Sequence, residues 1–467
     1  MNGSAPNEIQ IRQKIVYRLM RIPSALLVFL CVLVVVLLAA NSSAQSETER
    51  EIEKLKGQID EIQRQNQRQV EELKRRIDEL ESKRRTESKA VDEVSAETEE
   101  GISWLENIRA GYDEGFFLKT KDDNFSLKFN AFFQFQFFIE DFDDERNAEP
   151  DVDVSFQIRR LRLYFTGNAF RPWLRYTIQL AADRGSRFEL RDAYIDLAYY
   201  ERAKPRFGQF KVPFNREELT SDSAIQFVDR SIVNDEFTLE RDIGAMLHGG
   251  LFDDILEYGV GIFNGTGRNV DKNEDSDLLY AARVTIMPFG RYLYSQMYSE
   301  NPEKPLLALG AAVAFIPGFN PVTEGSSNRE NLADAVLEIN PDVTDADVFQ
   351  FTADFAFKYL GFTAEAEYNL RHISPDIGDD TTGHGLRVQA GYFIIPWNLL
   401  LAFRYGIVDP DAERKDDIRQ EFTPAMGFYF FEQRIRITAD YSLLLERNQN
   451  GGDFKDHRFR LQTAVYF

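Results

Sequence analysis

The stretch SLKFNAFFQFQFFIE, residues Ser126 to Glu140, decides the fold of this 467-residue chain. It contains six phenylalanines, and apolar and polar side chains alternate along it. One face carries Phe125, Leu127, Phe129, Ala131, Phe133, Phe135, Phe137 and Ile139, and the other carries Ser126, Lys128, Asn130, Gln134, Gln136 and Glu140. This period of two predicts a β-strand with one apolar face and one polar face.

The same alternation recurs to the end of the chain, and about sixteen such strands can be counted between residues 124 and 467. They suit either a soluble sandwich, which buries the apolar face in a core, or an outer-membrane barrel, which turns that face to lipid. The barrel is favoured because many strands reach roughly ten residues, short and long connections alternate, and the last strand ends on Phe467. We therefore predict an all-β fold over residues 111–467, a transmembrane antiparallel β-barrel of about 16 strands.

The first 44 residues resemble an export signal. A basic leader that contains Arg12, Lys14, Arg18 and Arg21 precedes the uninterrupted apolar core of residues 25–40, and small residues follow it. We predict a signal peptide over residues 1–44, with cleavage before Gln45. The alternative is a retained membrane anchor, although the apolar core is shorter than the roughly 20 residues that a spanning helix needs.

Residues 46–85 are dominated by charged residues and glutamine, with apolar side chains at steps of three and four. The apolar positions are Ile52, Leu55, Ile59, Ile62, Val70, Leu73, Ile77 and Leu80. This spacing predicts an α-helical coiled coil, with Asn66 on its seam and a stutter before Val70. The alternative is a solvated single helix, but so polar a segment has too little apolar surface to bury alone. Residues 86–110 lose the pattern, and we predict that they form a linker.

The composition limits the classes of function. A formal net charge of -22 argues against a nucleic-acid-binding protein, which would need a basic face. The single cysteine, Cys31, lies in the predicted signal, so a mature chain would have no disulfide and no cysteine metal site. No cofactor is implied. The four histidines are scattered and none lies beside a recognisable nucleophile motif, so we predict that the protein is not an enzyme.

The polar faces of the predicted strands would line the interior of the barrel, and they are mildly basic. They include Arg175, Arg283, Arg434 and Arg436. Lumenal arginine and lysine favour anions, although these charges could equally pair with one another and keep the lumen wet. The connection over residues 213–241 is long enough to fold into the lumen, and its charges are mixed. The connection over residues 291–304 is long where a short turn is expected, and the sequence pattern gives no reason for its length.

Several motifs, in order, resemble the phosphate-selective porin O and P family. They are FQIRRLRLYFTGN (156–168), LRDAYIDL (190–197), FGQFKVPF (207–214), FVDRSI (227–232), RDIGAML (241–247), GVGIFNGTG and YAARVTIMPFG. The resemblance implies a trimeric sixteen-stranded outer-membrane barrel that passes phosphate, polyphosphate or other small anions. Carried over motif by motif, it implies an anion path through Arg159, Arg160, Arg162, Lys211, Arg230 and Arg241, to which the polar faces add the four arginines above.

Our leading hypothesis is therefore a passive pore for small, anionic solutes in the outer membrane of a Gram-negative-type bacterium. The alternatives are a non-selective or cation-preferring general porin, and a structural tether that joins the outer membrane to the cell wall through the coiled coil. In each case the N-terminal stalk over residues 46–85 would lie in the periplasm and the barrel would contact outer-membrane lipid.

Overall fold

The computed structural model describes residues 71, 75–77, 79, 107–144, 151–185, 187–270, 272–273, 277–297, 304–322, 329–414, 417–431, 434–447 and 453–467. Residues 104–467 form one compact unit. In the N-terminal unit the described residues, Glu71, Arg75–Ile77 and Glu79, are helical. The predicted signal peptide and almost all of the predicted coiled coil lie outside the described residues. Among the residues that the structure describes, none of the helices is long and apolar enough to span a bilayer.

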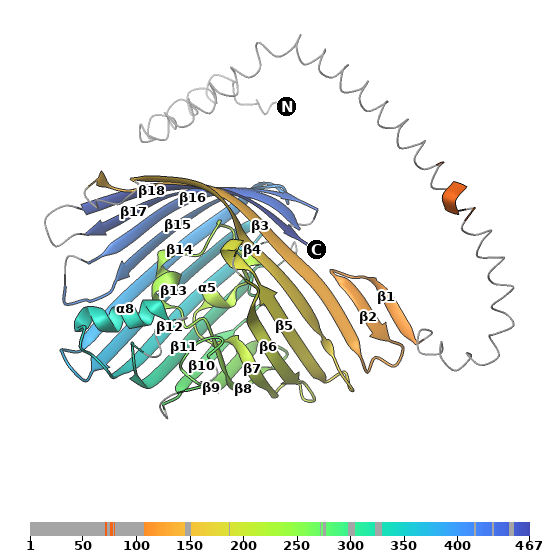
Figure 1. Cartoon of the computed structure of the whole chain (residues 1–467), viewed down its shortest axis with the longest axis horizontal. Helices are drawn as coiled ribbons and strands as arrows, with labels where there is room; N and C mark the ends of the chain where they lie inside the picture. Colours follow the sequence, from red (N-terminus) through yellow and green to blue (C-terminus); the bar gives the residue numbers. More distant parts are fainter. Residues whose placement is uncertain are drawn as a thin grey trace, which may run out of the picture. The chain divides into compact units, whose positions relative to one another are not determined.

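Sixteen antiparallel strands form one closed sheet (Figure 1), which confirms the predicted barrel. They are β3 (Ser126–Asp141), β4 (Val152–Asn168), β5 (Leu174–Ala181), β6 (Glu189–Leu197), β7 (Lys204–Lys211), β8 (Arg241–Leu251), β9 (Leu256–Phe263), β10 (Leu279–Ile286), β11 (Leu306–Phe319), β12 (Ala346–Tyr359), β13 (Phe362–Pro375), β14 (Thr381–Ile395), β15 (Leu399–Asp409), β16 (Arg419–Phe430), β17 (Ile435–Arg447) and β18 (Asp453–Tyr466). Each strand pairs with the next. The sheet closes where β18 pairs with β3, from His457 opposite Asp141 to Tyr466 opposite Phe132.

The side chains alternate between the two faces of the sheet as the sequence predicts. On β12, Phe349 and Phe355 are exposed on the outside, whereas Thr352 and Asp354 are buried on the inside. Exposed aromatic and aliphatic side chains recur on the outer face of nearly every strand. The barrel therefore has an apolar exterior and a polar interior, the reverse of a soluble domain.

A hairpin that the sequence analysis did not predict precedes the barrel. It consists of β1 (Ile108–Tyr112) and β2 (Phe116–Thr120), and β2 pairs with the first residues of β3. The first three residues of β1 are the last three of residues 86–110, the segment predicted as a linker. Each of these strands has only five residues, and an alternation over five residues cannot be distinguished from that of an irregular segment.

Two β-bulges shift the alternation on the wall formed by β4 to β6. Between β3 and β4 the register passes from Gln134 opposite Arg160 to Phe135 opposite Ile158, so Arg159 is the extra residue. A similar shift between β5 and β6 leaves Arg191 extra. A bulge places two consecutive side chains on the same side of a sheet. It therefore brings Arg159 beside Arg160, and Arg191 beside Asp192, inside the barrel.

Three connections fill the lumen (Figure 1). The inserted loop, residues 212–240, contains α5 (Arg216–Leu219), η4 (Asp222–Ala224) and α6 (Ile232–Phe237), and most of its residues are buried. The connection between β11 and β12 carries α8 (Glu330–Ile339), whose Leu332 and Val336 join an apolar cluster on the inner wall. The inner connection, described over residues 287–297, enters from the opposite end of the barrel, the end that carries the short turns. The prediction that the long loop after β7 folds into the lumen is thus confirmed.

The apolar exterior gives a first prediction. Phe355→Arg places a charge on the outer face of β12, and it should make folding into a bilayer less favourable by about 2–4 kcal/mol. Phe355→Leu keeps the surface apolar and should cost less than about 1.5 kcal/mol. Guanidinium titrations of folding into lipid vesicles measure both values, and equal values for the two variants would contradict a lipid-facing position.

Candidate functional site

The β4 wall holds the inserted loop through Asp229. Arg159 Nη2 lies 2.5 Å from Asp229 Oδ2, and Arg160 Nη2 lies 2.7 Å from Asp229 Oδ1. The bulge makes this double contact possible, since regular alternation would turn Arg159 outward. Arg160 also donates to Gln134 Oε1 at 2.9 Å on the neighbouring strand. Both arginines face the lumen, and they share the single carboxylate of Asp229.

Asp222 of the inserted loop is surrounded by three arginines. Arg162 and Arg230 donate to its two oxygens, and Arg160 Nη2 lies 3.4 Å from Oδ1. Asp222 lies outside the strands, and burial raises the pKa of its carboxyl. The three guanidinium groups outweigh burial and hold this pKa well below its usual range. Asp222 is therefore ionised at neutral pH.

A second group of pairs joins α5 to β6, β7 and β8. Lys211 donates to the carbonyl oxygens of Glu218 and Thr220 at the end of α5. Arg241 binds Asp192 through two hydrogen bonds of 3.0 and 3.1 Å and lies 3.5 Å from Glu218 Oε1. The last turn of α5 is thus held against the wall by two cations.

From β10 and β17, Arg283 and Arg436 bind main-chain carbonyls of the inserted loop. Arg283 donates to Phe214 O at 2.6 Å and to Asp354 Oδ2 at 2.6 Å. Arg436 donates to the carbonyl oxygens of Asp222 and Ser223 at 2.9 and 2.8 Å. These contacts fix the path of the loop backbone across the barrel.

Two of the ten predicted path residues lie elsewhere. Arg434 lies in the turn before β17, not in a strand, and donates to the hydroxyl of Tyr112 in β1. Arg175 is exposed near the start of β5 and pairs with Glu201 in a short turn. Both residues therefore lie at the short-turn rim of the barrel, whereas the other eight lie around the inserted loop.

The sequence analysis did not single out the most deeply buried ion pairs. Glu217 of α5 lies 3.2 Å from Arg387 and 3.8 Å from Arg404, and Arg404 also pairs with Glu421. Arg387 and Glu421 are each 0% exposed. The acid Glu217 belongs to the inserted loop, whereas its arginine partners belong to β14 and β15, which are far away in the chain. The alternation along these strands indicates that the arginines face inward, but it cannot show which acids they pair with. Arg191 was missed because its bulge leaves no trace in the alternation.

The contacts of the inner connection explain its length, for which the sequence pattern gave no reason. Gln296 N donates to Ala224 O at 2.8 Å, and Gln226 Nε2 donates to Gln296 O at 2.8 Å. Lys358 donates to Met297 O at 2.7 Å. Gln296 and Met297 are 2% and 4% exposed. The connection is long because it enters the lumen from the short-turn end of the barrel and contacts the inserted loop there.

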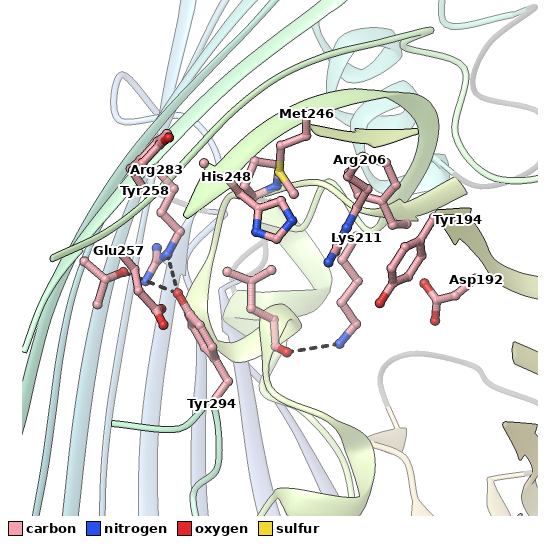
Figure 2. Close-up of a pocket in the computed structure, with 15 residues that line it drawn as sticks. Asp192, Tyr194, Arg206, Lys211, Met246, His248, Glu257, Tyr258, Arg283 and Tyr294 are labelled. Carbon is pink, nitrogen blue, oxygen red and sulfur yellow. Dashed lines mark hydrogen bonds between the residues drawn. The ribbon is translucent and has the colours of Figure 1, made fainter. Parts of the chain in front are cut away.

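Two cavities lie on opposite sides of α5. The outer cavity, of about 500 Å³, is lined by Glu218 and Arg230 and by Glu189 and Arg268 near the long-loop end. The inner cavity, of about 310 Å³, is lined by Leu219 and by residues nearer the short-turn end (Figure 2). Lys211, Arg206 and Tyr194 stand on one side of the inner cavity, and Glu257, Arg283 and Tyr294 stand on the other. The consecutive residues Glu218 and Leu219 thus line different cavities.

The charges that line the outer cavity are divided unevenly between the strands and the connections. The strands that line the outer cavity contribute Arg159, Arg160, Arg162 and Arg191 and only one acid, Glu189. The remaining acids of the cavity lie on the connections. Within the described ranges, no cluster of histidine, cysteine and carboxylate side chains could hold a metal ion.

A family model, phosphate-selective porin O and P, matches residues 129–467. An uncharacterised protein of Aquifex aeolicus (strain VF5) is 22% identical over 376 residues, which cover 70% of this chain and 84% of that protein. Among solved structures, an anion-selective porin from Comamonas acidovorans has a TM-score of 0.51 at 12% identity, with 73% of this chain and 100% of that chain covered. The outer membrane channel DcaP of Acinetobacter baumannii has a TM-score of 0.50 at 13% identity, with 77% and 100% covered. Family and fold point to an outer-membrane channel rather than an enzyme.

The buried pairs predict how the inserted loop is stabilised. Arg387→Met leaves the buried carboxylates of Glu217 and Glu365 without their shared partner, and it should lower the free energy of unfolding by about 3–5 kcal/mol. Arg175→Met removes a solvent-exposed pair and should change it by less than about 1 kcal/mol. Equilibrium unfolding in detergent compares the two variants. Similar losses would show that Arg387 does not anchor the loop.

Proposed function

The chain belongs to the phosphate-selective porin O and P family, and on that premise we propose that it forms a water-filled outer-membrane channel for passive diffusion of small anions of the phosphate or polyphosphate type. The arginine-rich strand wall of the outer cavity carries this proposal. Fixed positive charge in a narrow aqueous passage partly replaces the hydration that an anion loses. The proposed path residues include Arg159, Arg160 and Arg162 at the outer cavity and Lys211 and Arg283 at the inner cavity.

A general porin without anion preference is the second candidate. The outer cavity is lined by seven arginines, but also by seven acids: Asp183, Glu189, Glu218, Asp229, Asp235, Glu240 and Glu330. Equal numbers of opposite charges favour a wet passage with little net potential. Both candidate functions require an open channel, and they differ in the charge of the ion that the channel prefers.

Conductance in planar bilayers tests both the channel and its selectivity. Under a potassium chloride gradient, we expect a reversal potential near the chloride equilibrium potential, and we expect added phosphate to reduce the chloride current. A reversal potential near the potassium equilibrium potential would exclude the anion path. Complete absence of conductance by folded protein would favour the tether instead.

We further propose that the barrel is a homotrimer and that residues 46–85 form a periplasmic coiled coil that reaches toward the cell wall. Support comes from the family resemblance, from the heptad-like spacing, and from the helical conformation of Arg75, Ile77 and Glu79. Ile77 is 51% exposed in the single chain, as expected of a seam residue that lacks its partner helix.

Deletion of residues 46–85 separates the role of the stalk from that of the pore. If the stalk is mechanical, single-channel conductance should stay unchanged, because no described residue of the lumen comes from this segment. The oligomeric state, measured by light scattering with detergent correction, should remain trimeric if the barrel alone sets assembly. Monomers after deletion would show that the stalk also determines oligomer number, and altered conductance would contradict a purely mechanical stalk.

A further inference from the structure

The charged side chains that line the inner cavity are all paired except one. The paired side chains and their partners are Asp192 with Arg241, Arg206 with Asp196, Lys211 with Glu218, and Arg283 with Asp354. Within the part of the barrel that the structure describes, the carboxylate of Glu257 forms no ion pair and accepts no hydrogen bond. Glu257 is partly exposed, and it leaves the cavity with an unbalanced negative charge.

The nearest cations do not neutralise Glu257. Arg291, Lys204 and Arg216 attract its carboxylate only from beyond the distance of an ion pair. Lys204 and Arg216 are each paired with other carboxylates, and Arg291 is exposed on the inner connection. The carboxylate of Glu257 is therefore available to a cation that enters from solution.

An apolar surface adjoins Glu257 within the same cavity. Gly259 is the next inward-facing residue of β9, and a Cβ atom there would lie 3.3 Å from Met246 Sδ and 3.4 Å from Pro213 Cβ. Successive inward-facing positions of a strand are roughly 6.6 Å apart. Met246 and Pro213 thus present an apolar surface about one short alkyl chain away from the carboxylate.

Hydroxyl oxygens lie beside Glu257 on the neighbouring strand. Thr285 of β10 is directly opposite Glu257, and its hydroxyl lies 3.3 Å from that of Tyr294. Directly opposed residues have Cβ atoms roughly 4.5–5.5 Å apart. Both Thr285 and Tyr294 line the cavity. An ammonium group, which has three donors, would find hydroxyl acceptors beside the carboxylate.

We propose that the inner cavity binds a small organic cation, a primary ammonium ion with a short apolar chain, and that Glu257 is its counter-ion. The cavity volume of about 310 Å³ is at the lower end of the roughly 300–1,000 Å³ of ligand pockets, which suits a small solute. Figure 2 places Lys211 and Glu257 on opposite sides of the cavity, so an ammonium ion and an anion on the proposed path would contact different walls. Binding at Glu257 does not require the channel to conduct anions.

The site favours an ammonium ion over a divalent metal ion. Calcium and magnesium ions take about six oxygen ligands or more, whereas this wall of the cavity supplies one carboxylate and two hydroxyl groups. An alkylammonium ion also buries its chain against Met246 and Pro213, which adds a hydrophobic contribution that an inorganic ion cannot make.

Saturation-transfer NMR with the folded, detergent-solubilised full chain tests the site with three probes, after subtraction of the signal from protein-free micelles. We expect n-butylammonium to bind about tenfold more tightly than n-butanol, which lacks the charge. It should also bind more tightly than methylammonium, which lacks the apolar chain. Equal dissociation constants for n-butylammonium and n-butanol would overturn the proposal.

Two neutralising variants test the role of the carboxylate. Glu257→Gln keeps the shape of the side chain and removes its charge, so it should weaken the binding of n-butylammonium about tenfold. Glu338→Gln, the control, removes one charge from the exposed side of α8 and should leave this binding unchanged. Equal effects of the two variants, or unchanged binding by Glu257→Gln, would overturn the assignment. If Glu257→Gln fails to fold, the comparison of the three probes on the wild type still decides the proposal.

Planar bilayers separate this site from the channel function. Under a potassium chloride gradient, Glu257→Gln should shift the reversal potential toward the chloride equilibrium potential, because the inner cavity loses its unbalanced negative charge. A shift toward the potassium equilibrium potential would contradict this charge assignment. A protein that binds n-butylammonium without conducting would support the site and refute the channel.

Discussion

Closure of the sheet through the pairing of β18 with β3 is the constraint on which the rest of the structure depends. A closed sheet satisfies every ladder of backbone hydrogen bonds and leaves no edge, and this allows strands to cross a lipid bilayer. Closure with sixteen strands also encloses more space than the side chains of the strands can fill. The polar faces therefore look inward onto a wide lumen, and connecting segments must enter it to make a passage that discriminates between solutes.

The inserted loop solves this problem by electrostatic pairing with the wall rather than by apolar packing alone. Its acids meet arginines of β4 on one side and of β14 and β15 on the other, while Arg436 and Arg283 bind its carbonyl oxygens. Desolvation offsets much of the attraction between buried charges, so the number of pairs is no measure of stability. Removal of one partner nevertheless leaves a buried charge unpaired, and this strongly destabilises the folded protein. The network therefore fixes the position of the loop, and with it the width and charge of the passage, more firmly than it stabilises the barrel.

The sequence predicted the barrel closely because the alternation of side chains is repeated in every long strand. Each repeat of the pattern strengthens the assignment of the others. It predicted the interior less well. A bulge moves Arg159 and Arg191 into the lumen, and a single extra residue is not visible in a pattern of period two, so only the family resemblance pointed to Arg159 and nothing pointed to Arg191. The pairing of Glu217 with Arg387 joins residues 170 positions apart, which no local pattern reports. The inner connection could be recognised as too long, but its contact with Gln226 depends on the geometry of two loops that enter from opposite ends.

The inserted loop is held inside the barrel, where it meets the inner connection. Cross-linking between cysteines at positions 226 and 296, in a chain with Cys31 replaced by serine, tests this contact most directly. Gln226→Cys and Gln296→Cys together should cross-link efficiently with a short bifunctional thiol reagent in the folded protein in membranes, and each variant alone should not. Failure of the pair to react, while both thiols are labelled by a small monofunctional reagent, would contradict a lumen closed by these two connections.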